Sequence, residues 1–210
     1  MKIYEDIEQG TEEWLRLREL KFTASNASTI LAQGKGLDTL IKKMLVDHYS
    51  TRQYPEYTDD YKSYHMQRGN EFEHRARTIY ELETGNEVKQ VGFVELDEHI
   101  GCSPDGLVGD NGLIEIKNFS DSKFMELLIT KKVEAKYINQ MQFQMYVTGR
   151  EWVDFFVFNP NFDTNFFLLR VNRSEGAMDD IKVALKNATG RLKTAKKNVD
   201  IIMKGETNGN

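Results

Sequence analysis

The chain of 210 residues is poor in cysteine and proline and has no long apolar run. Its single cysteine, Cys102, excludes an intrachain disulfide and any cysteine-rich zinc site. Since no apolar run approaches the roughly 20 residues that span a bilayer, no membrane segment is expected. Residues 1–6 include acidic side chains and lack the apolar stretch of a signal peptide. These absences predict a cytoplasmic protein.

Signs of a domain boundary are also scarce. The sequence has only three prolines, no internal repeat and no low-complexity segment. A chain of this length with 40% hydrophobic residues can bury roughly 70% of its unfolded surface around one core. We therefore expect a single domain over residues 1–210.

The formal net charge of −5 argues, taken alone, against a nucleic-acid partner. Net charge governs solubility and long-range steering, however, and a local basic groove can coexist with an acidic whole. Residues 182–204 show such a local excess, with seven lysines or arginines against the single acid Asp200. A solvated helix face is the simpler interpretation of that run.

Hydrophobic periodicity predicts an α/β domain in which helices flank a mostly β core. Helices are expected at 11–20, 24–33, 37–50, 66–84, 122–130, 135–147 and 174–203. Strands are expected at 87–96, 113–118, 152–158 and 166–171, and the polar, tyrosine-rich segment 54–64 is expected to be a loop. Thr11 and Ser122 are the predicted N-caps of their helices, and Gly85 is the predicted stop of the helix at 66–84.

Two opposite charges interrupt the strand predicted at 113–118. Side chains alternate along a strand, so Glu115 and Lys117 share one face while Ile114 and Ile116 share the other. The isoleucines are expected to face the core. The charged pair must then face groups that compensate its charge.

The residues upstream, 109–112 (Gly-Asp-Asn-Gly), are typical of a hairpin in which two turns compete. A two-residue loop would put Asp105 opposite Asn118, on the isoleucine face. A three-residue loop at 110–112, with its last glycine left-handed, pairs Asp105 with Lys117. We adopt the second register, because it gathers Asp105 with both charged residues of the strand.

Two carboxylates this close repel each other, and one would ordinarily take up a proton. A divalent cation removes the conflict, and a few oxygen ligands suit Mg²⁺ or Mn²⁺ better than zinc. Lys117 would add a positive charge near metal-bound water. The alternative is an ion pair of Lys117 with Glu115 or Asp105 that serves register alone. Spacing does not decide between the two.

The helix predicted at 66–84 offers a third acid, Glu73, at the border of its apolar stripe. Glu73 can therefore point inward. Arg77 lies four residues further on, however, at the spacing of a helical ion pair. Helix geometry alone favours a surface salt bridge between the two.

Five ordered sequence blocks resemble the phage lambda exonuclease family, the YqaJ-like viral recombinases of the PD-(D/E)xK nuclease superfamily. The blocks run from about residue 10 to residue 160 and consist of WLRLR (14–18) followed by TAS (23–25), RGNEFE (68–73), CSPDG (102–106), GLIEIK (112–117) and YINQMQ (137–142). The resemblance implies a restriction-endonuclease-like core, with a central mixed β-sheet flanked by helices.

The same resemblance implies a set of catalytic residues. Asp105 and Glu115 would bind one or two Mg²⁺ ions, with Mn²⁺ possible and the carbonyl of Ile116 as a further ligand. Lys117 would position or activate the attacking water, and Glu73 would hold metal-bound water as an outer acid. Gln140 matches an active-site position of the family, whereas Gln142 is left open between a site role and a structural one.

A 5′-phosphate pocket is also implied, formed by Arg18, Thr23, Ser25 and Ser103. A guanidinium offers a fork for phosphate oxygens, and hydroxyls add neutral donors. Each residue has a plainer interpretation as well. Arg18 fits a solvated helix, Thr23 fits a turn, and the two serines fit caps of a helix or a turn.

The function implied is a Mg²⁺-dependent 5′→3′ exonuclease on double-stranded DNA that releases mononucleotides and leaves 3′ overhangs for strand annealing. The family also implies a trimeric ring around DNA, an annealing protein as partner, and a phage or prophage origin within a bacterial cytoplasm. The alternative enzyme is an endonuclease or resolvase with the same core, which would not need the phosphate pocket. A catalytically silent DNA-binding adaptor is a third reading, disfavoured because Asp105, Glu115 and Lys117 are all present.

Overall fold

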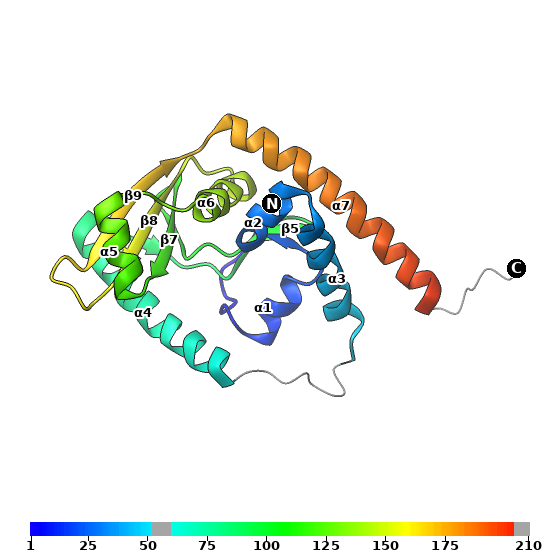
Figure 1. The fold of residues 1–210 in the computed structure, drawn as a ribbon, viewed down its shortest axis with the longest axis horizontal. Coiled ribbons are helices and arrows are strands. Elements are labelled where there is room, and N and C mark those ends of the chain that lie inside the picture. The colour runs from blue at the N-terminus through cyan, green and yellow to red at the C-terminus, as the bar shows by residue number, and fades with distance from the viewer. Residues whose placement is uncertain (52–59, 204–210) are drawn as a thin grey trace, which may run out of the picture.

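The computed structural model describes residues 1–51 and 60–203, excluding the side chains of residues 60–71. Its strands form two sheets (Figure 1). The smaller sheet has the order β1 (Lys2–Tyr4), β4 (Phe93–Asp97), β5 (Ile100–Cys102) and β2 (Phe22–Thr23). The larger has the order β3 (Val88–Lys89), β6 (Gly106–Val108), β7 (Gly112–Asn118), β8 (Trp152–Phe158) and β9 (Phe166–Asn172). Both are mixed, because β2 with β5 and β7 with β8 run parallel while the other pairs are antiparallel.

The helices cover these sheets and lie near their predicted positions. They are α1 (Glu12–Leu17), the 3₁₀ turn η1 (Ala24–Asn26), α2 (Ala27–Ala32), α3 (Lys35–Tyr49), α4 (Asp60–Thr84), α5 (Asp121–Thr130), α6 (Ala135–Thr148) and α7 (Glu175–Met203). The predicted cap of α1 is confirmed, since the Thr11 hydroxyl accepts a hydrogen bond from the backbone N–H of Trp14. Gly85, with φ of +70°, ends α4 as expected.

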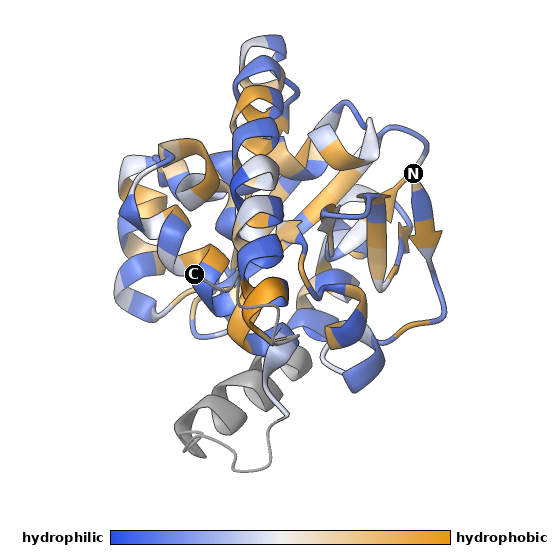
Figure 2. Ribbon diagram, turned by 90° about the vertical axis from the view of Figure 1, so that its right-hand side faces the viewer, coloured by the Kyte–Doolittle hydropathy of each residue, from blue (hydrophilic) through white to orange (hydrophobic). Residues whose placement is uncertain are grey.

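The larger sheet separates two apolar layers (Figure 1). Ile114 and Ile116 of β7 pack with Tyr80 of α4, whereas Leu113 packs with Met141 of α6. Strand alternation therefore turns Glu115 toward the α6 side. In Figure 2 hydrophilic and hydrophobic residues are interleaved along α7, as expected of a helix that buries one face. No helix in the described part of the chain is long and apolar enough to cross a membrane.

The hairpin register is shifted by two residues from the prediction. The observed pairs are Gly106 with Ile114 and Val108 with Gly112, so the loop comprises residues 109–111. Gly109 takes the left-handed φ of +51°. Gly112 instead lies inside the strand, where a Cβ would come within 2.1 Å of the Trp152 ring. A glycine needed for close packing was thus mistaken for the turn glycine.

The shift preserves the side on which the acid lies. Continued by one residue, the observed register brings Asp105 level with Glu115 instead of Lys117. Because a shift of two residues keeps the same face, Asp105 still lies on the side of Glu115 and away from Ile114.

Three further expectations were wrong. The strand predicted at 87–96 is two strands in different sheets, β3 and β4, separated by a short segment in which the Gly92 N–H donates to the Tyr4 carbonyl at 2.9 Å. Ser120, not Ser122, is the N-cap of α5. Residues 60–64 of the predicted loop belong to α4, and its residues 54–59 lie outside the described part.

Candidate active site

The Asp105 carboxylate is bound to the backbone of β7. Its Oδ2 accepts a hydrogen bond from the Ile116 N–H at 2.6 Å. Asp105 lies directly before β6, whereas Ile116 lies between Glu115 and Lys117. The hairpin therefore brings Asp105 beside the charged pair of β7, as the sequence predicted, although through a different register.

Glu115 is fully buried, and both of its carboxylate oxygens are held. Oε1 accepts from Gln140 Nε2 at 2.6 Å and forms an ion pair with Lys117. Oε2 accepts from Gln144 Nε2, also at 2.6 Å. Gln140 and Gln144 are separated by one turn of α6, so a single helix face fixes the orientation of the carboxylate.

Gln144 was missed by the sequence reasoning, which considered only Gln140 and Gln142. The signal was its i+4 spacing from Gln140. Gln142 instead ties α6 to the segment between β9 and α7, because its Nε2 donates to the Asn172 carbonyl at 2.8 Å and its Oε1 accepts from the Ser174 N–H at 3.0 Å. The structural interpretation of Gln142 is therefore the right one.

Burial and charge shift the titration of this cluster. Burial raises the pKa of Asp105 well above its usual range, and neighbouring Glu115 raises it further, against the opposing effect of Lys117. Burial lowers the pKa of Lys117, but the two carboxylates outweigh it and leave that pKa above its usual value. Lys117 is thus held as an ammonium ion, while burial and Glu115 favour the protonated form of Asp105.

Glu73 forms an ion pair within α4 and also lies near the charged pair of β7. Its Oε1 lies 2.7 Å from Arg77 Nη2, which confirms the predicted ion pair within α4. Burial raises the pKa of Glu73, chiefly against the effects of Arg77 and Lys117, and Glu115 also raises it. The carboxylate is therefore close enough to the charged pair of β7 to interact with it electrostatically.

The donor set suits a hard divalent cation. The described residues contain no group of three or more His, Cys, Asp or Glu side chains that could hold a metal ion. Asp105 and Glu115 still offer oxygen only, and repulsion by Glu115 adds to burial in raising the pKa of Asp105, an effect that a bound cation would oppose. Mg²⁺ retains several waters and needs only one or two carboxylates. The residues present therefore fit Mg²⁺ or Mn²⁺.

A second cluster adjoins the carboxylates and contains all four predicted phosphate-pocket residues. Arg18 Nη1 donates to Ser103 Oγ at 3.2 Å, and its Nη2 lies 3.5 Å from Thr23 Oγ1. Thr23 Oγ1 is 3.3 Å from Ser25 Oγ. The backbone from Ser103 to Asp105 connects this hydroxyl cluster to the carboxylates.

Arg18 is held there without an acidic partner among the ion pairs of the described residues. Its guanidinium carbon lies 4.1 Å from the centroid of the Trp14 ring, whose Nε1 donates to Ser103 Oγ at 2.9 Å. Burial is the main cause that lowers the pKa of Arg18. A partly buried cation surrounded by hydroxyls is suited to a phosphate group.

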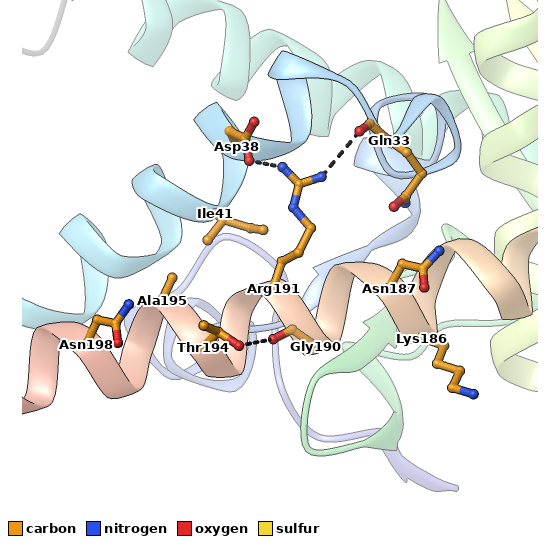
Figure 3. A pocket seen from close by; sticks show the side chains of 10 residues that line it. All are labelled: Gln33, Asp38, Ile41, Lys186, Asn187, Gly190, Arg191, Thr194, Ala195 and Asn198. Carbon is orange, nitrogen blue, oxygen red and sulfur yellow. Dashed lines mark hydrogen bonds and ion pairs between the residues drawn. The ribbon is translucent and has the colours of Figure 1, made fainter.

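A hollow of about 770 Å³ opens elsewhere, between α3 and α7 (Figure 3). Arg191 projects into it from α7, donates to the Gln33 carbonyl and pairs with Asp38 of α3. None of its lining residues belongs to the two clusters above. Arg191 of the basic run is thus engaged in packing α7 against α2 and α3.

Comparison with known proteins matches residues 13–151 to the model of a YqaJ-like viral recombinase domain. A search of curated proteins found no match. The crystal structure of LHK-Exo in complex with dAMP is 31% identical, with a TM-score of 0.83, over 94% of this chain and 100% of that one.

Two further solved structures are similar. The alkaline exonuclease LHK-Exo from Laribacter hongkongensis is 31% identical, with a TM-score of 0.75, over 91% of this chain and 100% of that one. A phage-related exonuclease from Haemophilus somnus 129PT is 18% identical, with a TM-score of 0.61, over 88% and 98% of the two chains. The predicted restriction-endonuclease-like α/β fold is thereby confirmed.

Proposed function

Because this chain belongs to the family of YqaJ-like viral recombinases and is a DNA exonuclease, we propose that it digests double-stranded DNA in the 5′→3′ direction with Mg²⁺. It releases mononucleotides and leaves 3′ overhangs for recombination by strand annealing. The observation that carries the proposal is the Arg18 cluster, connected to Asp105 through Ser103.

The Arg18 cluster supports the choice of a 5′ end. A terminal phosphate carries more negative charge than an internal phosphodiester, and Arg18 offers it a guanidinium whose hydrogen-bond partners among the described residues are the hydroxyls of Ser103 and Thr23. Ser103, Thr23 and Ser25 add hydroxyl donors. A strand bound by its 5′ phosphate would place the next phosphodiester near Asp105 and Glu115. An endonuclease has no use for such a pocket.

The carboxylates and Lys117 have different roles in the proposed reaction. Asp105, Glu115 and the Ile116 carbonyl would hold Mg²⁺, with Glu73 orienting bound water, and the metal would supply neutralisation of the phosphoryl oxygens and a more acidic attacking water. Gln140 and Gln144 keep the Glu115 carboxylate in one orientation. Lys117, kept protonated by both carboxylates, serves to orient water and stabilise developing negative charge, not as a general base.

Hydrolysis then forms a new bond from the attacking water oxygen to phosphorus and breaks the bond from phosphorus to the 3′ oxygen. The leaving 3′ oxygen takes up a proton, and a 5′-mononucleotide departs. A protein of net charge −5 would leave DNA quickly at physiological salt. We therefore include in the proposal a homotrimeric ring around the duplex, an annealing protein as partner and a phage-encoded role in the bacterial cytoplasm.

The decisive experiment is time-resolved digestion of end-labelled linear duplex in Mg²⁺, with and without a 5′ phosphate, beside closed circular DNA. We expect mononucleotides from the 5′ strand, faster initiation on phosphorylated ends and intact circles. Rapid cutting of circles would instead identify an endonuclease or resolvase, and digestion from 3′ ends would refute the proposed polarity.

A further inference from the structure

A pocket of about 330 Å³ lies between α5 and α6, just beyond the end of β7. Its aromatic floor is formed by the partly exposed Phe119 and Tyr137, and both rings pack on the fully buried Phe155, with ring centroids 5.5 to 6.4 Å apart. Lys123 and Lys132 also line the pocket. An aromatic surface beside positive charge is the combination with which proteins bind nucleic-acid strands.

Lys123 is positioned by four contacts. Its Nζ lies 4.1 Å from the centroid of the Phe119 ring and 4.9 Å from that of Tyr137. It also donates to the Tyr137 hydroxyl at 2.9 Å and pairs with Glu134 at 2.6 Å. About a third of the side chain remains exposed. Lys123 is therefore pre-oriented, yet accessible to a ligand.

The acid in this cluster is shared. Glu134 pairs with Lys136 at 2.9 Å as well as with Lys123, so the triad keeps one net positive charge. Lys131 and Lys132 follow α5 and are exposed. Within the pocket lining, Lys123 and Lys132 are balanced by Glu126 and Glu134, so the excess of positive charge at this edge comes from the neighbouring exposed Lys131 and Lys136.

The pocket adjoins the catalytic cluster on the Lys117 side. Phe119 follows Lys117 by two residues, and Tyr137 is close enough to interact electrostatically with the Lys117 ammonium. The Arg18 cluster adjoins the carboxylates through Ser103 instead. A strand that runs from Arg18 across the carboxylates would continue past Lys117 into this pocket.

We propose that the pocket between α5 and α6 is a binding subsite for one nucleotide of the DNA strand on the Lys117 side of the cleaved bond. Lys123 contacts a backbone phosphate, and the aromatic floor lies against the sugar and base. The assignment rests on the proposed function, because the direction of the strand follows from the 5′-phosphate pocket.

Because Glu134 pairs with both Lys123 and Lys136, a role of Lys123 in DNA binding can be distinguished from a purely structural ion pair between Lys123 and Glu134. If Lys123 and Glu134 only tie α5 to α6, then Lys123→Gln and Glu134→Gln break the same bond and act alike. If Lys123 contacts phosphate, the two changes have opposite effects on DNA affinity. Both variants should fold, because exposed ion pairs contribute little to stability and the Glu134 side chain makes no capping hydrogen bond.

The test is fluorescence anisotropy of a 3′-labelled, 5′-phosphorylated duplex with a short 5′ overhang, titrated with full-length protein in EDTA at several salt concentrations. Each phosphate contact contributes about 0.7 to 0.9 to the slope of log K against log salt. Lys123→Gln should reduce the magnitude of the slope by that amount. If the variant and wild type bind equally at 1 M salt, the variant then binds roughly five- to eightfold more weakly at 0.1 M salt. Glu134→Gln should bind more tightly than wild type.

The matched control is Lys196→Gln, because Lys196 is similarly exposed and also pairs with one carboxylate, Asp200. It lies near the C-terminal end of α7, at the opposite side of Figure 1 from α5. Its affinity and salt slope should match wild type. An unchanged slope in Lys123→Gln, or a loss of affinity in both pocket variants, would overturn the subsite. Failure of the wild type to digest DNA in Mg²⁺ would count against the proposed function instead.

Discussion

Gln144 donates its side-chain amide to Oε2 of Glu115 at 2.6 Å, and both side chains are fully buried. With Gln140 on the other oxygen, the carboxylate has one orientation before any metal binds. Mutating a residue that orients a metal ligand commonly lowers metal affinity or activity by about 10- to 100-fold.

We therefore expect Gln144→Leu to lower kcat by roughly 10- to 100-fold with little change in KM. The variant removes the buried Gln144 Oε1, which has no hydrogen-bond partner among the described residues, but it also leaves the buried Oε2 of Glu115 without its donor, so a stability loss of about 1–3 kcal/mol is expected. Steady-state digestion and thermal unfolding check both points. Gln142→Leu is the control, since it loses two backbone bonds and should lower stability more than kcat. Unchanged kcat in Gln144→Leu would remove Gln144 from the site.

Asp105→Asn should abolish digestion while stabilising the protein in EDTA above neutral pH. The folded-state pKa of Asp105 is raised by burial and Glu115, so the wild-type folded state binds more protons than the unfolded state between the two pKa values. Wild-type stability consequently falls as pH rises through that window, and asparagine avoids the loss. We expect a Tm advantage of a few degrees that shrinks as the pH is lowered through the folded-state pKa. A Tm difference between variant and wild type that is independent of pH would contradict the raised folded-state pKa of Asp105.

Lys117→Met should be inactive and less stable in the absence of metal. The change leaves Glu115 buried without its cation, and breaking a buried pair on one side costs about 3–5 kcal/mol; the partial exposure of Lys117 reduces that figure. Adding Mn²⁺ should restore part of the lost Tm, because the metal supplies positive charge to the same carboxylates. If Tm is unaffected by both the mutation and Mn²⁺, the ion pair has only a local role.

Arg18→Gln should slow initiation on 5′-phosphorylated duplex by roughly 10- to 100-fold, the value of a hydrogen bond to a charged group. Initiation on 5′-hydroxyl ends should change little, so the preference for phosphate disappears. Burst kinetics on the two substrates measure this ratio. Arg16→Gln, on the same helix but exposed and paired with Glu12, is the matched control and should keep the preference. A preference retained in Arg18→Gln would place the end recognition elsewhere.

Strand alternation was sufficient to predict which side of β7 carries the charged residues of the candidate site. Glu115 and Lys117 could be separated from Ile114 and Ile116 because period-2 alternation is a local property. The register of the hairpin was not local. Gly112 is needed beside Trp152, distant in sequence, whose ring leaves no room for a side chain at position 112, so this glycine does not mark the turn.

The candidate site was predicted to a similar extent. The sequence blocks identified Asp105, Glu115 and Gln140, which the fold brings together through side-chain or backbone contacts. Gln144 was overlooked because a glutamine on a helix with a buried face has no distinctive spacing until its partner is known. The division of residues 87–96 between two sheets depends likewise on tertiary pairing, which alternation alone does not encode.

The central claim is that Asp105 and Glu115 together hold a hard divalent cation. The most direct measurement is an anomalous-scattering map from crystals grown with MnCl₂. The account predicts a peak bonded to carboxylate oxygens of both residues, at roughly the 2.0–2.2 Å typical of such ligands, and no such peak in Asp105→Asn. A peak elsewhere would contradict it. So would the absence of a peak in crystals of wild-type protein that is active on DNA in the same buffer.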